Sequence, residues 1–160
     1  MKLRSATEQD LAHIIPWITS AEDCLLWAGP RVAFPMTVAS LRSDINFSGD
    51  NTFVLANVLA NDEILAFGQL LQRDDAVMHL ARIVVNPARR GGGNGRRLCE
   101  GLIHIAAERG ADRVSLFVYS SNAGARRLYA GLGFAEIAER SSDTVIFMLK
   151  PLAARAPASA

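Results

Sequence analysis

The feature that most constrains this chain of 160 residues is a glycine-rich turn between a strand pattern and a helix pattern. An apolar run over residues 80–85 precedes the turn, and a helical pattern over residues 98–108 follows it. Glycine lets the backbone bend and removes side chains that would block a close ligand. The free N–H groups of the helix's first turn then point at the ligand, with the positive end of the helix dipole behind them. The turn is therefore predicted to bind an anion, and the four arginines that flank it favour a phosphorylated ligand.

Two familiar glycine motifs do not fit this turn. A P-loop requires lysine and then a hydroxyl residue after its last glycine, and Gly95 is followed by neither. A dinucleotide fingerprint requires glycine where the chain has Arg96 or Leu98. The spacing that remains is Arg90-x-x-Gly93-x-Gly95.

This spacing resembles the R/Q-x-x-G-x-G/A signature of the GNAT superfamily of N-acetyltransferases, which binds the pyrophosphate of acetyl-coenzyme A. Residues 122–134 resemble a second family pattern, N-x-x-A-x-x-L-Y-x-x-x-G-F, and carry Asn122, Tyr129 and Phe134 in the expected order. The resemblance is specific over residues 77–134 and looser outside that span, where acceptor specificity usually lies.

The predicted elements agree with the fold that the resemblance implies. The patterns predict helices that begin at Thr7, Ser20, Thr37 and Asn122 and a long helix over residues 94–109. They predict strands over residues 1–6, 52–58, 63–72, 77–85, 113–119, 134–140 and 144–150. The resemblance implies an α/β (α+β) fold with a mixed, mostly antiparallel sheet of six to seven strands, flanked by about four helices. It also implies a splay between the strands before and after the glycine turn.

Length and composition define the general class of the protein. We expect one domain over residues 1–150 and a frayed tail over residues 151–160. A net charge of +1 argues against a nucleic-acid or membrane-surface binder, and no apolar run approaches the roughly 20 residues of a membrane span. Cys24 and Cys99 lie in apolar segments without CxxC spacing, which favours a reducing, cytoplasmic setting. Three histidines share no metal-ligand spacing, so no metal is expected.

The resemblance implies acetyl-coenzyme A as the co-substrate and assigns residues to it. The backbone of Ile83, Val84 and Val85 would lie along the pantetheine arm, with the N–H of Val84 or Val85 as oxyanion donor. Asn122 and Tyr129 would contact the cofactor as well. The residues expected at the pyrophosphate are Arg90, Gly91, Gly92, Gly93, Asn94, Gly95 and Arg96.

Tyr129 matches the family tyrosine that is often assigned as general acid to the coenzyme A thiolate. The alternative is that Tyr129 only packs beside Leu128.

The general base is open. Many family members carry a glutamate on the strand before the glycine turn, and here that position is His79, in a strand without a carboxylate. A histidine has a suitable pKa near 6.5, but His79 could equally be a strand residue with a structural hydrogen bond. A water chain, Glu22, Asp23 and Asp75 are the other candidates.

The first third of the chain is expected to cover the acceptor. Trp27 and Phe34 are candidates to line its pocket, and Glu22 or Asp23 could receive a cationic amine. Aromatic residues at this spacing are also common in cores, and acidic residues are common at helix starts.

The function predicted from the sequence is an acetyl-coenzyme A-dependent N-acetyltransferase that acts on a primary amine by direct attack. The acceptor is a small molecule, an antibiotic-like amine, or a peptide or protein amine. The alternative is a non-catalytic acyl-coenzyme A sensor or regulatory domain. A nucleotide-phosphate binder of another fold would leave residues 122–134 unexplained. The choice between monomer and homodimer stays open, since dimers are common in the family.

Overall fold

The computed structural model describes residues 1–153, which form seven strands, five α-helices and three short 3-10 helices. The strands are β1 (Lys2–Ser5), β2 (Thr52–Asn57), β3 (Glu63–Gln72), β4 (Val77–Val85), β5 (Arg113–Tyr119), β6 (Ala135–Glu136) and β7 (Val145–Pro151). The α-helices are α1 (Glu8–Ile14), α2 (Ala21–Ala28), α3 (Val38–Asp44), α4 (Asn94–Glu108) and α5 (Ala123–Gly131). The 3-10 helices are η1 (Ile15–Trp17), η2 (Pro87–Arg89) and η3 (Ala138–Arg140).

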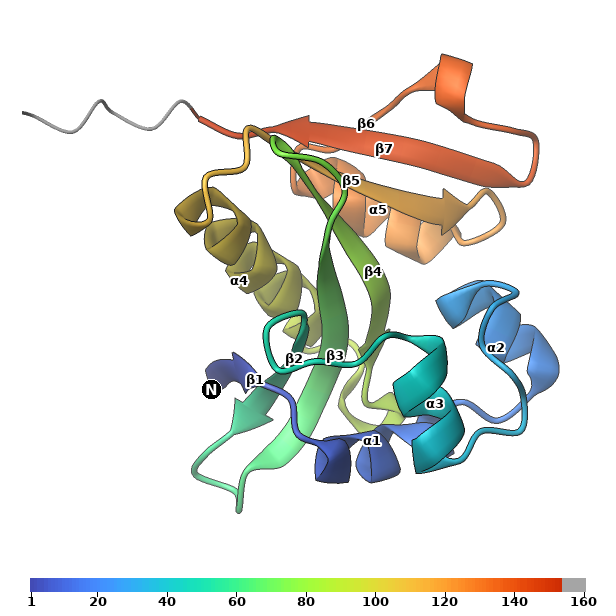
Figure 1. Ribbon diagram of the computed structural model, residues 1–160, viewed down its shortest axis with the longest axis vertical. Coiled ribbons are helices and arrows are strands. Elements are labelled where there is room, and N and C mark those ends of the chain that lie inside the picture. Colours follow the sequence, from blue (N-terminus) through green and yellow to red (C-terminus); the bar gives the residue numbers. More distant parts are fainter. Residues whose placement is uncertain (154–160) are drawn as a thin grey trace, which may run out of the picture. The chain divides into compact units, whose positions relative to one another are not determined.

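The strands form a seven-stranded sheet in the order β1-β2-β3-β4-β5-β7-β6 (Figure 1). The pairs β1–β2, β2–β3, β5–β7 and β6–β7 are antiparallel, whereas β4–β5 is parallel. A mixed, mostly antiparallel sheet with helices confirms the predicted fold class.

The chain divides into two compact units, each made of two separate segments. The first unit contains residues 1–69 and 81–98, and the second contains residues 70–80 and the chain from Cys99 onward. The single domain over residues 1–150 stays a prediction. The predicted tail begins at Pro151, which is the last residue of β7, and its residues 154–160 lie outside the described part.

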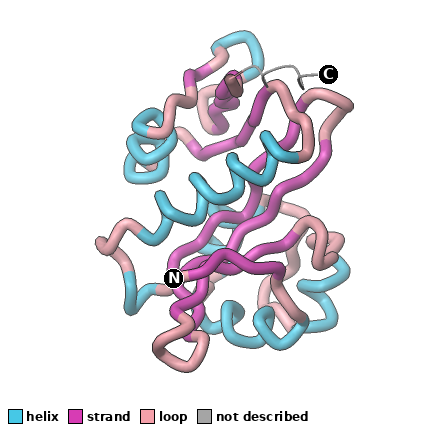
Figure 2. The backbone as a smooth tube through the Cα atoms, turned by 90° about the vertical axis from the view of Figure 1, so that its left-hand side faces the viewer, coloured by secondary structure: helices cyan, strands magenta, loops and turns pink. Residues whose placement is uncertain are grey.

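In the first unit, β1, β2 and most of β3 lie side by side (Figure 2). The predicted helix starts are confirmed here. Thr7 and Thr37 each form a capping box with the residue three positions later, and Ser20 caps α2. These side chains satisfy N–H groups that a helix start leaves without partners.

The core of the first unit comes from the apolar faces of its helices and the inner face of its sheet. Leu11 and Ile14 of α1 and Leu41 of α3 are fully buried in one cluster with Phe67 of β3. Each such side chain contributes about 1.5–3 kcal/mol of transfer free energy when it is removed from water.

The second unit is built on the antiparallel pair of β5 and β7, which runs from Arg113 opposite Pro151 to Tyr119 opposite Val145. Figure 1 shows α5 beside these two strands. Leu116 of β5 and Met148 of β7 are register partners, and each is 2% exposed.

The parallel pairing of β4 with β5 is short. It runs from Val77 opposite Arg113 to Leu80 opposite Leu116. Both strands continue past this last pair, β4 to Val85 and β5 to Tyr119.

The last predicted hairpin differs from the structure. The strand predicted over residues 134–140 is only the two-residue β6, and residues 138–140 form η3. The hydroxyl of Ser141 donates to the carbonyl of Ile137 at 2.7 Å and accepts from the N–H of Phe147 at 2.9 Å. The N–H of Ile137 still donates to the carbonyl of Phe147 at 2.9 Å, so the Ser141 side chain takes the place of the return bond from Phe147 to Ile137.

Candidate functional site

The glycine turn joins η2 to α4 through two left-handed residues. Gly91 has a φ of 79° and Gly93 a φ of 77°, where a residue with a Cβ is strained. Both residues are exposed, and no atom lies within 4 Å of the place that a Cβ would take at Gly91. The backbone therefore requires glycine here, and the turn presents its main chain to solvent.

The turn ends in a helix start that offers N–H donors. The first helical hydrogen bond of α4 joins the N–H of Arg97 to the carbonyl of Gly93 at 3.0 Å. The N–H groups of Asn94, Gly95 and Arg96 come before this bond and have no acceptor within the helix. Together with the positive end of the helix dipole, they provide what a phosphate group requires.

Two arginines beside the turn, Arg89 and Arg97, have guanidinium contacts that shape the turn and its surroundings. Arg89 forms a bidentate pair with Glu63 of β3, at 2.8 and 3.0 Å. Arg97 donates to a carbonyl oxygen of the turn at 2.7 Å, which stabilises the shape of the turn. Arg90 and Arg96, on either side of the glycines, have exposed side chains.

Two asparagines hold the ends of the turn. Asn86 donates its backbone N–H to Leu65 at 2.9 Å and its side-chain amide to the carbonyl of Ile64 at 3.0 Å. Asn94, which is 6% exposed, donates its side-chain amide to the carbonyl of Arg89 at 3.0 Å. The turn is therefore tied to β3 at one end and closed on itself at the other.

The middle of β4 contains a distortion at Arg82 that the sequence did not predict. Arg82 has a φ of 53°, a left-handed value that costs a residue with a side chain about 1–3 kcal/mol and often marks a functional site. The indole Nε1 of Trp27 donates to the carbonyl oxygen of Arg82 at 2.9 Å. After it, Val84 is buried, whereas Ile83 and Val85 are partly exposed. The alternation of residues in the strand does not predict the positive φ of Arg82.

His79 lies in the second unit and is 4% exposed. Its Nδ1 is 2.8 Å from the hydroxyl oxygen of Ser115, its register partner on β5. Its ring also packs against Phe117 with 5.2 Å between ring centroids. A base role for this buried imidazole requires water or acceptor to reach it, and the role stays a prediction.

Tyr129 and Asn122 belong to α5 and its start. Tyr129 is 8% exposed, and its ring meets Phe134 edge-on at 6.1 Å. Burial raises the pKa of its phenol, with a smaller effect from the Cys99 thiol. The hydroxyl therefore keeps its proton at neutral pH, as a general acid must before transfer. Asn122 caps α5 by accepting the N–H of Ala125 at 3.2 Å, which confirms the predicted helix start.

The predicted acceptor residues lie on α2 and after it. Glu22 and Asp23 are exposed in the first turn of α2, where Asp23 accepts a hydrogen bond from the hydroxyl of Thr19 at 3.0 Å. Phe34 is 39% exposed. Trp27 is partly buried and packs against the buried Phe67, with 6.1 Å between ring centroids.

The predicted site residues divide between the two units. Those of the second unit are His79, Asn122 and Tyr129. Those of the first unit are Glu22, Asp23, Trp27, Phe34, Ile83, Val84, Val85 and residues 90–96.

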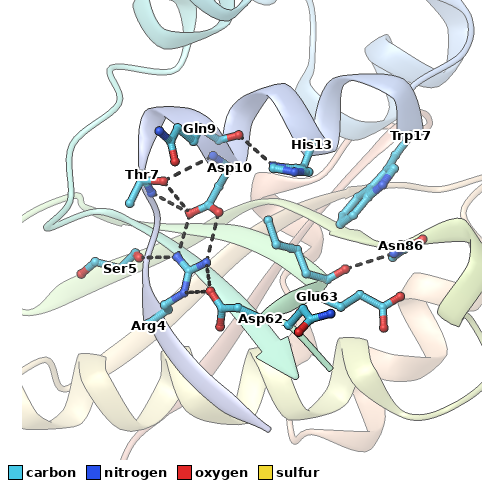
Figure 3. A pocket seen from close by; sticks show the side chains of 12 residues that line it. Arg4, Ser5, Thr7, Gln9, Asp10, His13, Trp17, Asp62, Glu63 and Asn86 are labelled. Carbon is cyan, nitrogen blue, oxygen red and sulfur yellow. Dashed lines mark hydrogen bonds and ion pairs between the residues drawn. The ribbon is translucent and has the colours of Figure 1, made fainter. Parts of the chain in front are cut away.

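The first unit also contains a cavity of about 570 Å³ beside α1 (Figure 3). On its wall, Arg4 binds the buried Asp10 at 2.7 and 3.1 Å and Asp62 at 2.7 and 3.1 Å. Asp10 also accepts the N–H of Thr7 at 2.7 Å. Burial alone would raise the pKa of Asp10, but the hydrogen bonds from Arg4 and Thr7 outweigh it and lower that pKa. These charges satisfy one another and join β1, α1 and the β2–β3 turn.

Within residues 1–153, no group of three or more His, Cys, Asp or Glu side chains is arranged to hold a metal ion. No helix in this part of the chain is both long and apolar enough to span a membrane.

Residues 17–134 match the model of the acetyltransferase (GNAT) family. The chain is 33% identical over 130 residues to a mycothiol acetyltransferase of Kineococcus radiotolerans, an alignment that covers 77% of the chain and 42% of that relative. Mycothiol acetyltransferases of two further species also match, and the chain spans less than half the length of these curated relatives.

Solved structures of other proteins have the same fold as this chain. The ribosomal-protein-S18-alanine N-acetyltransferase of Escherichia coli superposes with a TM-score of 0.71 at 26% identity, over 99% of this chain and 98% of that one. A Mycobacterium tuberculosis protein solved in complex with CoA and NLQ superposes with a TM-score of 0.69 at 18% identity. That alignment covers 96% of this chain and all of the other.

Proposed function

Because the chain belongs to the acetyltransferase (GNAT) family, we propose that it transfers an acetyl group from acetyl-coenzyme A to a primary amine. The observation that carries the proposal is the turn of residues 90–96, where two left-handed glycines lead into the start of α4. The amine nitrogen attacks the thioester carbon directly, the bond to sulfur breaks, and the amine loses a proton. A site for this reaction must remove that proton, stabilise the oxyanion and protonate the thiolate.

The residues of the turn fit a pyrophosphate. Gly91, Gly92 and Gly93 are exposed, whereas Gly95 is buried at the start of α4. The N–H groups of residues 94–96 precede the helical ladder, and Arg90 and Arg96 are exposed beside them. In this proposal these groups bind the phosphates, and Gly91, Gly92 and Gly93 let the ligand approach the main chain. The superposed protein that was solved with CoA supports coenzyme A as the ligand.

The backbone of Ile83, Val84 and Val85 is proposed to hold the pantetheine arm. The N–H of Val84 or Val85 is proposed to stabilise the negative charge that develops on the carbonyl oxygen. The left-handed Arg82 directly before them supports the proposal, because strained residues gather where a chain must aim its backbone groups. Asn122 is proposed to contact the same arm.

Tyr129 is proposed as the general acid that returns a proton to the thiolate. Its burial supports this role, since the raised pKa keeps the phenol protonated. His79 is the first candidate for the base, and a water chain, Glu22, Asp23 and Asp75 are the alternatives.

The acceptor is proposed to be a small-molecule amine or the amine of a peptide or protein. The names of the relatives, mycothiol acetyltransferase in one group and ribosomal-protein-S18-alanine N-acetyltransferase in another, refer to a small molecule and to a protein. Trp27, Phe34, Glu22 and Asp23 are proposed to face the acceptor. A cytoplasmic setting is proposed because Cys24 and Cys99 are buried free thiols.

A second candidate is a non-catalytic domain that binds an acyl-coenzyme A as a sensor. The observation that favours it is β4, which carries no carboxylate and whose one imidazole is buried. Both functions need a coenzyme A ligand, so binding alone cannot separate them. Only the enzyme transfers the acetyl group to an amine, so a measurement of turnover does.

The test is thermal unfolding with and without acetyl-coenzyme A, beside the desulfo and 3′-dephospho analogues. A ligand at about a hundred times its dissociation constant adds roughly 2.7 kcal/mol to the free energy of unfolding. We expect a raised midpoint with acetyl-coenzyme A and a smaller rise with the dephospho analogue. An unchanged midpoint would refute both candidate functions.

Turnover is then measured by thiol release over an amine panel of kanamycin, spermidine and a peptide with an N-terminal alanine. Acetylation of any of these supports the enzyme. A raised midpoint without thiol release from any acceptor favours the sensor.

A further inference from the structure

The strained residue of β4 is held by two elements of its own unit. Arg82 reaches a φ of 53° in the middle of a strand, a conformation that does not persist without support from neighbouring groups. Its carbonyl is bound by Trp27 of α2, which lies 55 residues earlier in the chain, and its guanidinium is bound by Gln69 of β3.

The contact with Gln69 anchors the side chain of Arg82. Its Nη1 donates to Oε1 of Gln69 at 2.6 Å. Gln69 is fully buried, and its Nε2 donates to the carbonyl of Ile45 at 3.1 Å and to the hydroxyl of Thr52 at 3.0 Å. The acceptor of the guanidinium is therefore itself fixed in a buried polar network, where an unmade hydrogen bond is costly.

The contact with Trp27 fixes the backbone. The carbonyl of Arg82 and the N–H of Ile83 belong to one planar trans peptide, so they point in opposite directions. The indole that binds this carbonyl at 2.9 Å thereby sets the direction of the Ile83 N–H. The ring of Trp27 cannot move freely, because it packs against Phe67, which is fully buried.

We propose that Trp27 is a positioning residue, whose indole N–H holds the Arg82–Ile83 peptide so that the backbone N–H groups of Ile83, Val84 and Val85 keep their catalytic direction. The inference rests on the proposed acetyl transfer. It also links α2, which carries Glu22 and Asp23, to the strand that is proposed to stabilise the oxyanion.

The test removes only the N–H group. The chain has two tryptophans, so Trp17→Phe leaves Trp27 as the only site where an analogue of tryptophan is incorporated. Replacing that tryptophan with β-(3-benzothienyl)alanine keeps the size and the packing but puts sulfur in place of N–H. Trp17→Phe with ordinary tryptophan is the matched control, and Trp27→Phe in the natural sequence is a second variant.

Three quantities are compared: kcat with the panel amine that the natural chain acetylates fastest, the dissociation constant of acetyl-coenzyme A, and amide hydrogen exchange at residues 83–85. Displacing a group that positions or stabilises the reacting atoms can slow a reaction by about a hundredfold. We therefore expect kcat of the protein with the analogue at position 27 to be at least about tenfold lower than that of the control. We expect the dissociation constant to rise less than about threefold, because the pyrophosphate contacts lie on the turn. Exchange at residues 83–85 should become faster.

An unchanged kcat together with unchanged exchange would mean that Trp27 only packs, and the inference would be wrong. Equal losses in kcat and affinity would also overturn it, since they indicate a general loosening of the unit. If the natural chain acetylates no amine, the proposed function fails. The exchange measurement then still decides whether the indole holds this peptide.

Discussion

The Nδ1 atom of His79 lies 2.8 Å from the hydroxyl oxygen of Ser115, which is also its register partner on β5. Both side chains are buried, at 4% and 2% exposure. The bond fixes the ring and engages Nδ1, so a base role for His79 requires Nε2 to be the unprotonated nitrogen. The tautomer that Ser115 selects therefore decides whether His79 can act as a base.

The first prediction concerns this pair. If His79 is the base, His79→Gln should lower kcat/KM about a hundredfold, the lower range for general base catalysis. A base acts in its neutral form, so activity of the natural chain rises with pH through the pKa of the base, and this rise should disappear in the variant. Ser115→Ala should shift the rise without removing it. A rise that persists in His79→Gln would assign the base to another group.

The second prediction concerns the glycine turn. Gly93→Val should raise the dissociation constant of acetyl-coenzyme A at least about tenfold, because valine at a φ of 77° is strained and reorients the donors of the turn. Space is not the reason, since a Cβ there would meet only the flexible Arg97 side chain at 3.7 Å. Gly110→Val is the matched control, with a φ of 86° and open space around its Cβ. Scanning calorimetry should show that the two variants lose similar amounts of stability. Titration calorimetry should show that only Gly93→Val loses affinity for acetyl-coenzyme A. Equal dissociation constants for the two variants would contradict the cofactor assignment.

Local signals explain what the sequence predicted well. Thr7, Thr37 and Asn122 cap their helices as expected, because a cap depends on a side chain and an N–H group three residues away. The turn glycines were predictable for the same reason, since the dihedral angle and the residue type are linked at one position.

The distant contacts of the site were not predictable. The hydrogen bond from Trp27 to Arg82 joins residues 55 positions apart, and periodicity carries no information about such a contact. The place of Arg89 beside the turn predicts a phosphate contact, but Arg89 pairs with Glu63, 26 residues earlier. These contacts depend on which strands become neighbours, and that is a property of the whole sheet.

The third prediction concerns Tyr129. Tyr129→Phe removes the proposed acid but keeps the ring that packs against Phe134, so kcat should fall about a hundredfold or more while the affinity for acetyl-coenzyme A changes less than about twofold. Burial raises the pKa of this phenol, so its ionisation should contribute no fall in activity between pH 6 and 9. Tyr119→Phe is the matched control, because Tyr119 is the other tyrosine of the chain. Equal losses of kcat and affinity would make Tyr129 a binding residue only.

The fourth prediction concerns the carboxylate of Asp10, which is 5% exposed and receives hydrogen bonds from Arg4 and Thr7. Those bonds outweigh the effect of burial and hold the pKa of Asp10 below its ordinary value of 3.8 in the folded chain. A lowered pKa in the folded state means that the charged carboxylate stabilises the protein above the unfolded-state pKa. This contribution is lost as the pH falls through about 4 and below.

Asp10→Asn should therefore lower the free energy of unfolding by about 1–3 kcal/mol at pH 7, the cost of lost hydrogen bonds to a charged group. The difference from the natural chain should shrink as the pH falls to about 3, because protonation weakens the same bonds in the natural chain. Asp62→Asn is the control, since Asp62 is the more exposed partner of Arg4 at 47% and should cost less than about 1 kcal/mol. Urea unfolding at several pH values measures both. A difference for Asp10→Asn that stays constant from pH 7 to pH 3 would show that packing and helix capping, rather than the charge of Asp10, stabilise this corner of the first unit.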